Sequence, residues 1–149
     1  MNTTYMALEF VHPDFGRRAG QVVVSPEESG MRLSAKHAIS LVYHEASVRQ
    51  AILILLTTRP GERVMRPQYG CMLHTLAFAP NDDTTAGLAI HYVRQALDLW
   101  EPRIRIARLD AGRNPETGEI LNIYLEYVVL ATNRTEQMVV PVILSGAEN

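Results

Sequence analysis

Cys71 and His74 are the two side chains of this sequence whose types and spacing most directly suggest chemistry. A cysteine thiolate is a nucleophile, and a nearby histidine could act as its base. The same pair could contribute to a metal site. Neither interpretation has a third partner at a recognisable spacing. Because Cys71 is the only cysteine, an internal disulfide and a cysteine-built zinc site are excluded. The simpler expectation is a buried thiol beside a loop histidine, so the sequence assigns no catalytic residue, metal ligand or cofactor.

The remaining histidines and the carboxylates form no recognisable catalytic pattern. The other histidines are scattered along the chain, at His12, His37, His44 and His91. Paired carboxylates are the machinery of glycosidases, but nearly any protein of this size offers such pairs. Those available here include Glu62, Glu101, Glu119 and Glu126. There is also no glycine-rich phosphate loop and no H-E-x-x-H zinc motif.

A long loop between two predicted helices is more distinctive. It extends from Arg59 to Pro80 and begins with the sequence RPGERVMRP. Its local charge comes from Arg59, Arg63 and Arg66 against a single Glu62. Loops of this length in a small domain usually carry function, and arginine is favoured at protein interfaces.

A second distinctive segment is Glu101-Pro102-Arg103, which joins the second predicted helix to the first predicted strand. Pro102 fixes the backbone and holds a carboxylate and a guanidinium on either side of a rigid corner. The simpler interpretation is a helix stop with an ordinary ion pair. Because both charged residues follow a helix end, we expect them outside the core, where replacing either one leaves the protein folded.

Composition limits the class of protein. The chain has 149 residues, of which 47% are hydrophobic and 20% charged, as in one globular domain with a core. Its net charge of −2 disfavours a free-standing nucleic-acid binder. Lys36 is the only lysine, so arginine carries the basic charge, either through codon bias or because arginine serves an interface.

The sequence shows no export or membrane signal. The first residues lack a basic segment followed by a long apolar one. The longest aliphatic run, Ala51–Leu56, has six residues, whereas a membrane span needs about 20. We therefore expect a cytoplasmic protein.

Two helices follow from the apolar spacing. The first begins at Glu45 and must end by Arg59, because the following Pro60-Gly61 cannot continue it. The second is predicted from Thr84 to Trp100, preceded by the N-cap candidates Asp82 and Asp83.

After Arg103 the apolar pattern has period two, which is typical of strands. Strands are predicted from Ile104, over Ile120–Leu130 and over Met138–Leu144, with turns at 114–119 and 132–136. Pro141 predicts an edge position for the last strand. In the first strand the alternation predicts Ile104, Ile106 and Arg108 on one face and Arg105, Ala107 and Leu109 on the other.

The predicted fold class is α+β. Two helices pack on a three-stranded antiparallel meander, with an extended N-terminal arm and a possible extra strand. The arm comprises residues 1–37 and the domain residues 38–149. Strand-like stretches at Gln21–Val24 and Ala38–Tyr43 are candidates for the extra strand.

The loop and the corner, in this order and spacing, resemble the family of small baseplate wedge, or sheath-initiator, proteins of contractile tails. Members occur in myophage baseplates, type VI secretion systems, tailocins and extracellular contractile injection systems. The matching segments are the helix Ser47–Leu56, the loop Arg59–Pro67, the second helix with its corner, and the following strands. The resemblance covers roughly Ala38–Leu144.

The resemblance implies a structural role. Glu101, Pro102 and Arg103 would dock on the helical core of neighbouring wedge subunits, and the strands would template the first sheath ring by strand addition. The implied partners are other wedge proteins and the tail sheath protein, with spike, hub or tube-proximal subunits as further candidates. Six copies are implied in a six-fold, tail-like particle that is assembled in the cytoplasm. The implied contact residues are Glu101, Pro102, Arg103, Arg59, Glu62, Arg63, Arg66 and Pro141.

Two other functions compete with this one. Some family members have carried a lysozyme label, so a cell-wall hydrolase of a phage tail is the alternative. Against it, a carboxylate flanked by arginine, as Glu101 is, stays ionised and makes a poor general acid. A nucleic-acid-binding module is disfavoured by the acidic balance of the chain.

Overall fold

The fold was obtained as a computed structural model that describes residues 5–11, 30–31, 38 and 41–144. The predicted strand Gln21–Val24 lies outside the described residues. The chain divides into two compact units, Met1–Ile54 and Leu55–Asn149, and each is described here by itself. None of the helices in the described part is long and apolar enough to cross a membrane.

The first unit contains short strands and most of the first helix. β1 (Met6–Leu8) pairs antiparallel with β4 (Leu41–Tyr43), and β2 (Phe10–Val11) pairs with β3 (Gly30–Met31). The predicted strand at 38–43 is thus present in its last three residues. α1 (His44–Thr57) follows directly, and the Gln50 side chain donates a hydrogen bond to the Leu8 carbonyl (2.6 Å).

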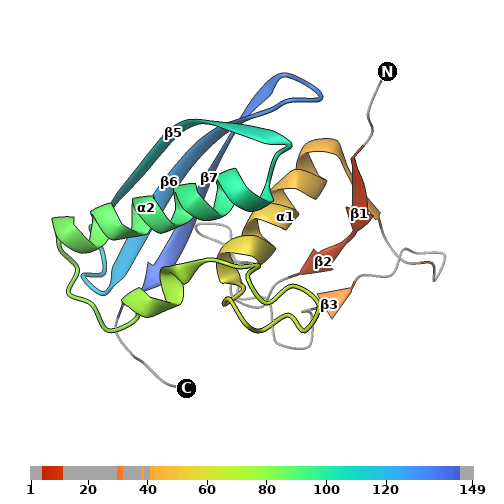
Figure 1. The fold of residues 1–149 in the computed structure, drawn as a ribbon. Coiled ribbons are helices and arrows are strands. Elements are labelled where there is room, and N and C mark those ends of the chain that lie inside the picture. The colour runs from red at the N-terminus through yellow and green to blue at the C-terminus, as the bar shows by residue number, and fades with distance from the viewer. Residues whose placement is uncertain (1–4, 12–29, 32–37, 39–40, 145–149) are drawn as a thin grey trace. The chain divides into compact units, whose positions relative to one another are not determined.

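The second unit holds one helix against a three-stranded sheet (Figure 1). α2 (Asp83–Trp100) packs mainly on β5 (Ile104–Arg113), and the short 3₁₀ helix η2 (Met72–Leu76) packs on α2. β6 (Ile120–Val129) is the central strand between β5 and β7 (Arg134–Ile143). Both pairings are antiparallel. The described chain therefore has two α-helices, α1 and α2, and a three-stranded antiparallel meander, which confirms the predicted α+β class.

The core of this unit comes from one face of the sheet and one stripe of α2. The helix buries small and branched side chains: Ala86, Ala89, Val93, Ala96 and Leu97. The central strand buries every second residue: Leu121, Ile123, Leu125, Tyr127 and Val129. This alternation agrees with the period-two pattern of the sequence.

Both ends of α2 are set by local chemistry. The Asp82 carboxylate accepts a hydrogen bond from the Thr85 N–H (2.8 Å), as an N-cap does, and this bond lowers the pKa of Asp82. At the other end the Glu101 N–H still donates to the Leu97 carbonyl (2.9 Å), and Pro102 then prevents a further turn. The predicted helix limits are confirmed to within one residue.

The predicted faces of the first strand are wrong beyond Ala107. The register with β6 shifts between Ile106 and Arg108, which marks a β-bulge. Because one extra residue reverses the alternation, Leu109 joins Ile104 and Ile106 on the inner face. Arg108 moves to the outer face, opposite Glu126.

The last strand also begins earlier than predicted. Asn133 adopts φ of 53°, a left-handed conformation that asparagine tolerates, and its N–H donates to the Val129 carbonyl (2.8 Å). This closes the turn tightly, so β7 starts at Arg134 and not at Met138. β7 is an edge strand, as predicted from Pro141, which lies opposite Asn122.

Candidate functional site

The arginine-rich loop is closed by its own backbone hydrogen bonds. Three successive turns are made when the N–H groups of Glu62, Arg66 and Tyr69 donate to the carbonyls of Arg59 (3.1 Å), Arg63 (3.2 Å) and Arg66 (3.1 Å). Two further bonds cross the loop, from Gly61 N–H to the Pro67 carbonyl (2.6 Å) and from Cys71 N–H to the Thr58 carbonyl (2.9 Å). The segment from Thr58 to Cys71 is therefore a compact, pre-organised loop.

Two glycines make this closure possible. Gly61 follows Pro60 with φ of +96°, the arrangement typical of a type II turn. Gly70 has φ of +138°, and a Cβ atom there would lie 2.5 Å from the Thr58 carbonyl oxygen. Only glycine allows the two ends of the loop to approach this closely.

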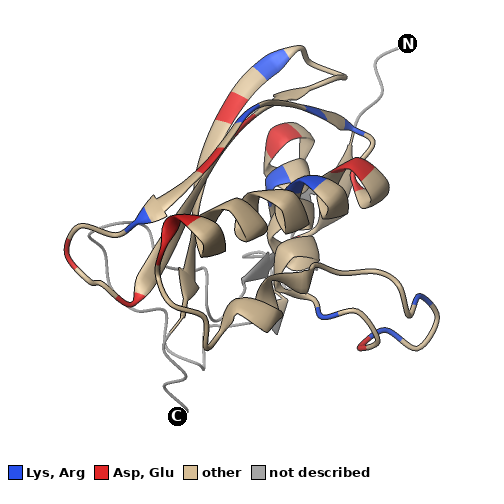
Figure 2. Ribbon diagram, turned by 60° about the vertical axis from the view of Figure 1, so that its left-hand side comes forward, with Lys and Arg blue, Asp and Glu red and all other residues tan. Residues whose placement is uncertain are grey.

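The predicted contact residues of the loop have different surroundings. Arg59, Arg63 and Arg66 are exposed, and Figure 2 shows basic positions spread along the loop as it extends away from α2. The carboxylate of Glu62 accepts a hydrogen bond from the Arg59 N–H (3.0 Å), so part of its role is to hold the first turn.

The corner after α2 is built around a two-pronged ion pair. Arg103 Nε and Nη2 donate to the two carboxylate oxygens of Glu101 at 2.6 and 2.7 Å. The Glu101 side chain is only 5% exposed, whereas that of Arg103 is 29% exposed and Pro102 lies on the surface. The expectation that both charged residues lie outside the core is thus wrong for Glu101, because the turn folds its carboxylate inward beneath the guanidinium.

Tyr69 joins the loop to the corner. The Arg63 guanidinium carbon lies 4.3 Å from the centre of the Tyr69 ring, a cation–π contact. Tyr69 also contacts Trp100, and the two rings meet edge-on with their centroids 5.4 Å apart. Burial raises the pKa of the Tyr69 hydroxyl, and nearby Glu101 acts in the same direction while Arg63 and Arg103 oppose it. The loop and the corner, which the sequence indicated separately, are therefore linked by side-chain contacts.

Sequence reasoning missed the residues that make this connection. Tyr69 lies within the loop and Trp100 lies beside the corner, but neither residue was assigned a role. Trp100 is the only tryptophan and immediately precedes the corner, which is the one signal that could have identified it. Pro141 belongs to β7 and takes no part in the contacts around Tyr69 that are described above.

Cys71 is buried, as expected, whereas His74 lies in the 3₁₀ helix η2 and not in a loop. The Cys71 thiol is 2% exposed and donates to the Tyr92 carbonyl at 3.5 Å, and burial raises its pKa. It is therefore a protonated, inaccessible thiol. His74 Nδ1 lies 3.2 Å from the carbonyl oxygen of Cys71, not from its sulfur. Within the described part of the chain, no cluster of three His, Cys, Asp or Glu side chains could hold a metal ion.

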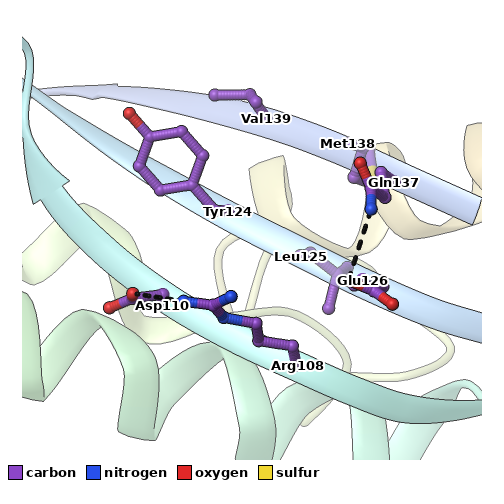
Figure 3. Close-up of a pocket in the computed structure, with 8 residues that line it drawn as sticks. All are labelled: Arg108, Asp110, Tyr124, Leu125, Glu126, Gln137, Met138 and Val139. Atoms are coloured by element: carbon purple, nitrogen blue, oxygen red, sulfur yellow. Dashed lines mark hydrogen bonds and ion pairs between the residues drawn. The ribbon is translucent and has the colours of Figure 1, made fainter.

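The outer face of the sheet carries a shallow hollow (Figure 3). Its lining includes Asp110, Tyr124, Glu126 and Val139, from three strands. The hollow is open, and its two carboxylates are already engaged. Arg108 lies 3.7 Å from Asp110, and Gln137 donates to Glu126 at 3.3 Å. This is not the enclosed, apolar setting that raises the pKa of a glycosidase acid.

Comparisons with known proteins show the family of this chain. A family model of the baseplate wedge protein gp25 matches residues 42–134, which include both segments. A Geobacter sulfurreducens protein, provisionally named a tail lysozyme, has 36% sequence identity and a TM-score of 0.64 over 79% of this chain and 99% of its own.

Two baseplate structures are similar at lower identity. A chain of the anti-feeding prophage baseplate has 19% identity and a TM-score of 0.56, covering 79% of this chain and 83% of its own. A chain of a type VI secretion baseplate complex has 23% identity and a TM-score of 0.48, covering 65% of this chain and 92% of its own. No curated protein matches the sequence. With the family model matching more than half of its length, the chain belongs to the family of the baseplate wedge protein gp25.

Proposed function

We propose that this protein is a structural component of the baseplate of a contractile injection machine, and that its corner docks on neighbouring wedge subunits. The observation that carries the proposal is the Glu101–Arg103 pair, locked by two hydrogen bonds and connected through Trp100 and Tyr69 to the arginine loop. Both parts lie inside the segment that matches the wedge family.

The three corner residues differ in exposure, and we therefore assign them different roles. Glu101 is buried, so it acts as a positioning residue that fixes the guanidinium. Pro102 and the exposed part of Arg103 are the groups that a partner can touch. Because the corner is rigid before docking, little conformational entropy is lost when the partner binds.

The sheet supplies the second proposed contact. β7 pairs on one side with β6, and among the described strands nothing pairs with its other side. An open edge accepts a strand from another chain through backbone hydrogen bonds. We assign this edge, which contains Pro141, to the first strand of the tail sheath.

The same observations support a role without catalysis. A hydrolase acid needs a carboxyl group that can reach the substrate, whereas the carboxylate of Glu101 is buried and accepts hydrogen bonds from Arg103 at both oxygens. The provisional lysozyme name of the similar Geobacter protein is therefore not extended to this chain. In the proposed role the protein assembles in the cytoplasm, with six copies in a six-fold baseplate.

The corner can be tested without unfolding the protein. In the variant Glu101→Met/Arg103→Met both charges are replaced by apolar side chains of similar size, a change that commonly leaves stability equal or higher. We expect a folded protein that no longer co-purifies with the co-expressed wedge subunits of its own particle. The matched control is Arg108→Met/Asp110→Met, an exposed pair at the same spacing on the sheet.

Two results would contradict the proposal. One is a normal yield of wedge complex from the folded corner variant. The other is lysis of purified cell walls by the isolated protein that is lost in Glu101→Gln, since it would establish the hydrolase alternative.

A further inference from the structure

Two apolar side chains at the tip of the arginine-rich loop are almost completely exposed. Val64 is 94% and Met65 is 91% exposed, the highest values among the large hydrophobic residues of the described chain. They are the two central residues of the turn that the Arg66 N–H closes on the Arg63 carbonyl. Exposed apolar groups gathered at one point often mark an interaction site.

The loop holds these side chains away from the protein. The bonds from Gly61 to Pro67 and from Cys71 to Thr58 fix the loop below its tip. Arg63 is further anchored on the Tyr69 ring. Val64 and Met65 are consequently presented on a pre-organised support and need little ordering when they bind.

The charge around the tip is one-sided. Arg59, Arg63 and Arg66 have no carboxylate partner among the residues that the structure describes. The nearby Glu62 carboxylate accepts a bond from the Arg59 backbone. The tip thus combines two exposed apolar side chains with nearby arginines whose positive charge is not paired with a carboxylate of the described chain.

We propose that Val64 and Met65 insert into an apolar groove of a neighbouring protein subunit, and that carboxylates on the rim of that groove pair with Arg59 and Arg66. The identification of this neighbour as a baseplate subunit rests on the proposed function. Flexible methionine adapts well to such a groove, and the arginines supply specificity at its edge. A phosphate backbone would pair with the arginines but would leave both apolar side chains in water. Two side chains are also too little apolar area to hold a protein of net charge −2 on an anionic membrane.

The environment of the tip can be measured directly. In the full-length variant Met65→Cys the introduced thiol is the only accessible one, because Cys71 is buried. An environment-sensitive dye attached there should shift to the blue when the labelled protein assembles with its wedge subunits. Photo-crosslinking from the same position should reach apolar residues with aspartate or glutamate nearby. The control label at Glu116→Cys, on the exposed β5–β6 turn, should stay in water.

Affinity and salt dependence separate the two parts of the tip. Val64→Ser/Met65→Ser should leave thermal stability unchanged and accelerate dissociation from the wedge complex by about tenfold or more for each side chain. Arg66→Glu should instead slow association and weaken its salt dependence, while Arg113→Glu, an exposed arginine at the end of β5, should do neither.

The outcomes distinguish this proposal from the proposed function. If the corner variant abolishes the complex while Val64→Ser/Met65→Ser and the dye show no effect, the tip proposal is overturned and the corner proposal stands. Binding of the isolated protein to a DNA duplex or to phosphatidylglycerol vesicles, if lost in Val64→Ser/Met65→Ser, would also overturn it.

Discussion

At the scale of single residues, the burial of the Glu101 carboxylate has a direct consequence for stability. Removing a carboxylate from water is costly unless a cation and good hydrogen bonds compensate it. Arg103 supplies both, with two bonds of 2.6 and 2.7 Å. The residues that we propose to dock the protein therefore also contribute to its fold, so assembly defects must be separated from folding defects.

This coupling predicts the effect of removing one partner alone. Arg103→Ala leaves Glu101 buried without its cation and should lower the free energy of unfolding by about 3 kcal/mol. Urea denaturation followed by Trp100 fluorescence measures this loss. Glu101→Met/Arg103→Met should restore most of it, because no charge then remains buried.

The exposed pair of Arg108 and Asp110 provides the comparison. Its side chains are 75% and 56% exposed and 3.7 Å apart, so Arg108→Ala should change stability by less than about 1 kcal/mol. Equal losses from Arg103→Ala and Arg108→Ala would mean that burial of Glu101 is not what makes the corner pair important.

At the scale of elements, the arginine-rich loop behaves as a unit because its two ends are pinned together. Gly70 is essential to this pinning, since a side chain would strike the Thr58 carbonyl. Gly61 also has a positive φ but meets no atom within 4 Å at the position of a Cβ. A substitution at Gly61 therefore introduces backbone strain alone, whereas a substitution at Gly70 adds a steric clash to it.

We predict that Gly70→Ala opens the base of the loop, whereas Gly61→Ala only strains one turn. Gly61→Ala should cost about 1 kcal/mol of stability, and Gly70→Ala clearly more. Because Trp100 is the only tryptophan and contacts Tyr69, its fluorescence reports whether the loop still reaches the corner. The spectrum should change in Gly70→Ala and stay as in the unaltered protein in Gly61→Ala. Identical spectra for all three proteins would show that Gly70 does not hold the loop in place.

The sequence predicted some elements well for physical reasons. α2 was located to within one residue because Asp82 and Pro102 are strong local signals for a helix start and stop. The faces of β5 were predicted incorrectly after Ala107, since a bulge depends on pairing with β6 and leaves no local signature. The contact between the loop and the corner could not be predicted either, because Tyr69 and Trp100 are 31 positions apart and meet only in the folded chain.

At the scale of the whole molecule, β7 has one buried face and one exposed face, so it can contribute to the core and still be available for the proposed sheath contact. Met138, Val140 and Leu144 are buried, so truncating this segment would damage the core. Val139 and Ile143 point away from it and are 52% and 58% exposed. Alternation along one strand therefore separates the residues that stabilise the core from those on the exposed face, which can be replaced without disturbing the core.

This separation allows strand addition to be tested with the sheet intact. Val139→Lys/Ile143→Lys places two charges on the exposed face of the edge strand, a device that natural proteins use to prevent edge pairing. Because both side chains are more than half exposed, the fold and the wedge complex should persist. Sheath, however, should fail to start on the baseplate or should polymerise away from it. Phe78→Lys/Leu88→Lys, which also replaces two exposed apolar side chains by lysine but outside the sheet, should start sheath normally. Electron microscopy of particles carrying each variant decides the question, since full-length sheaths seated on Val139→Lys/Ile143→Lys baseplates would exclude this edge as the template.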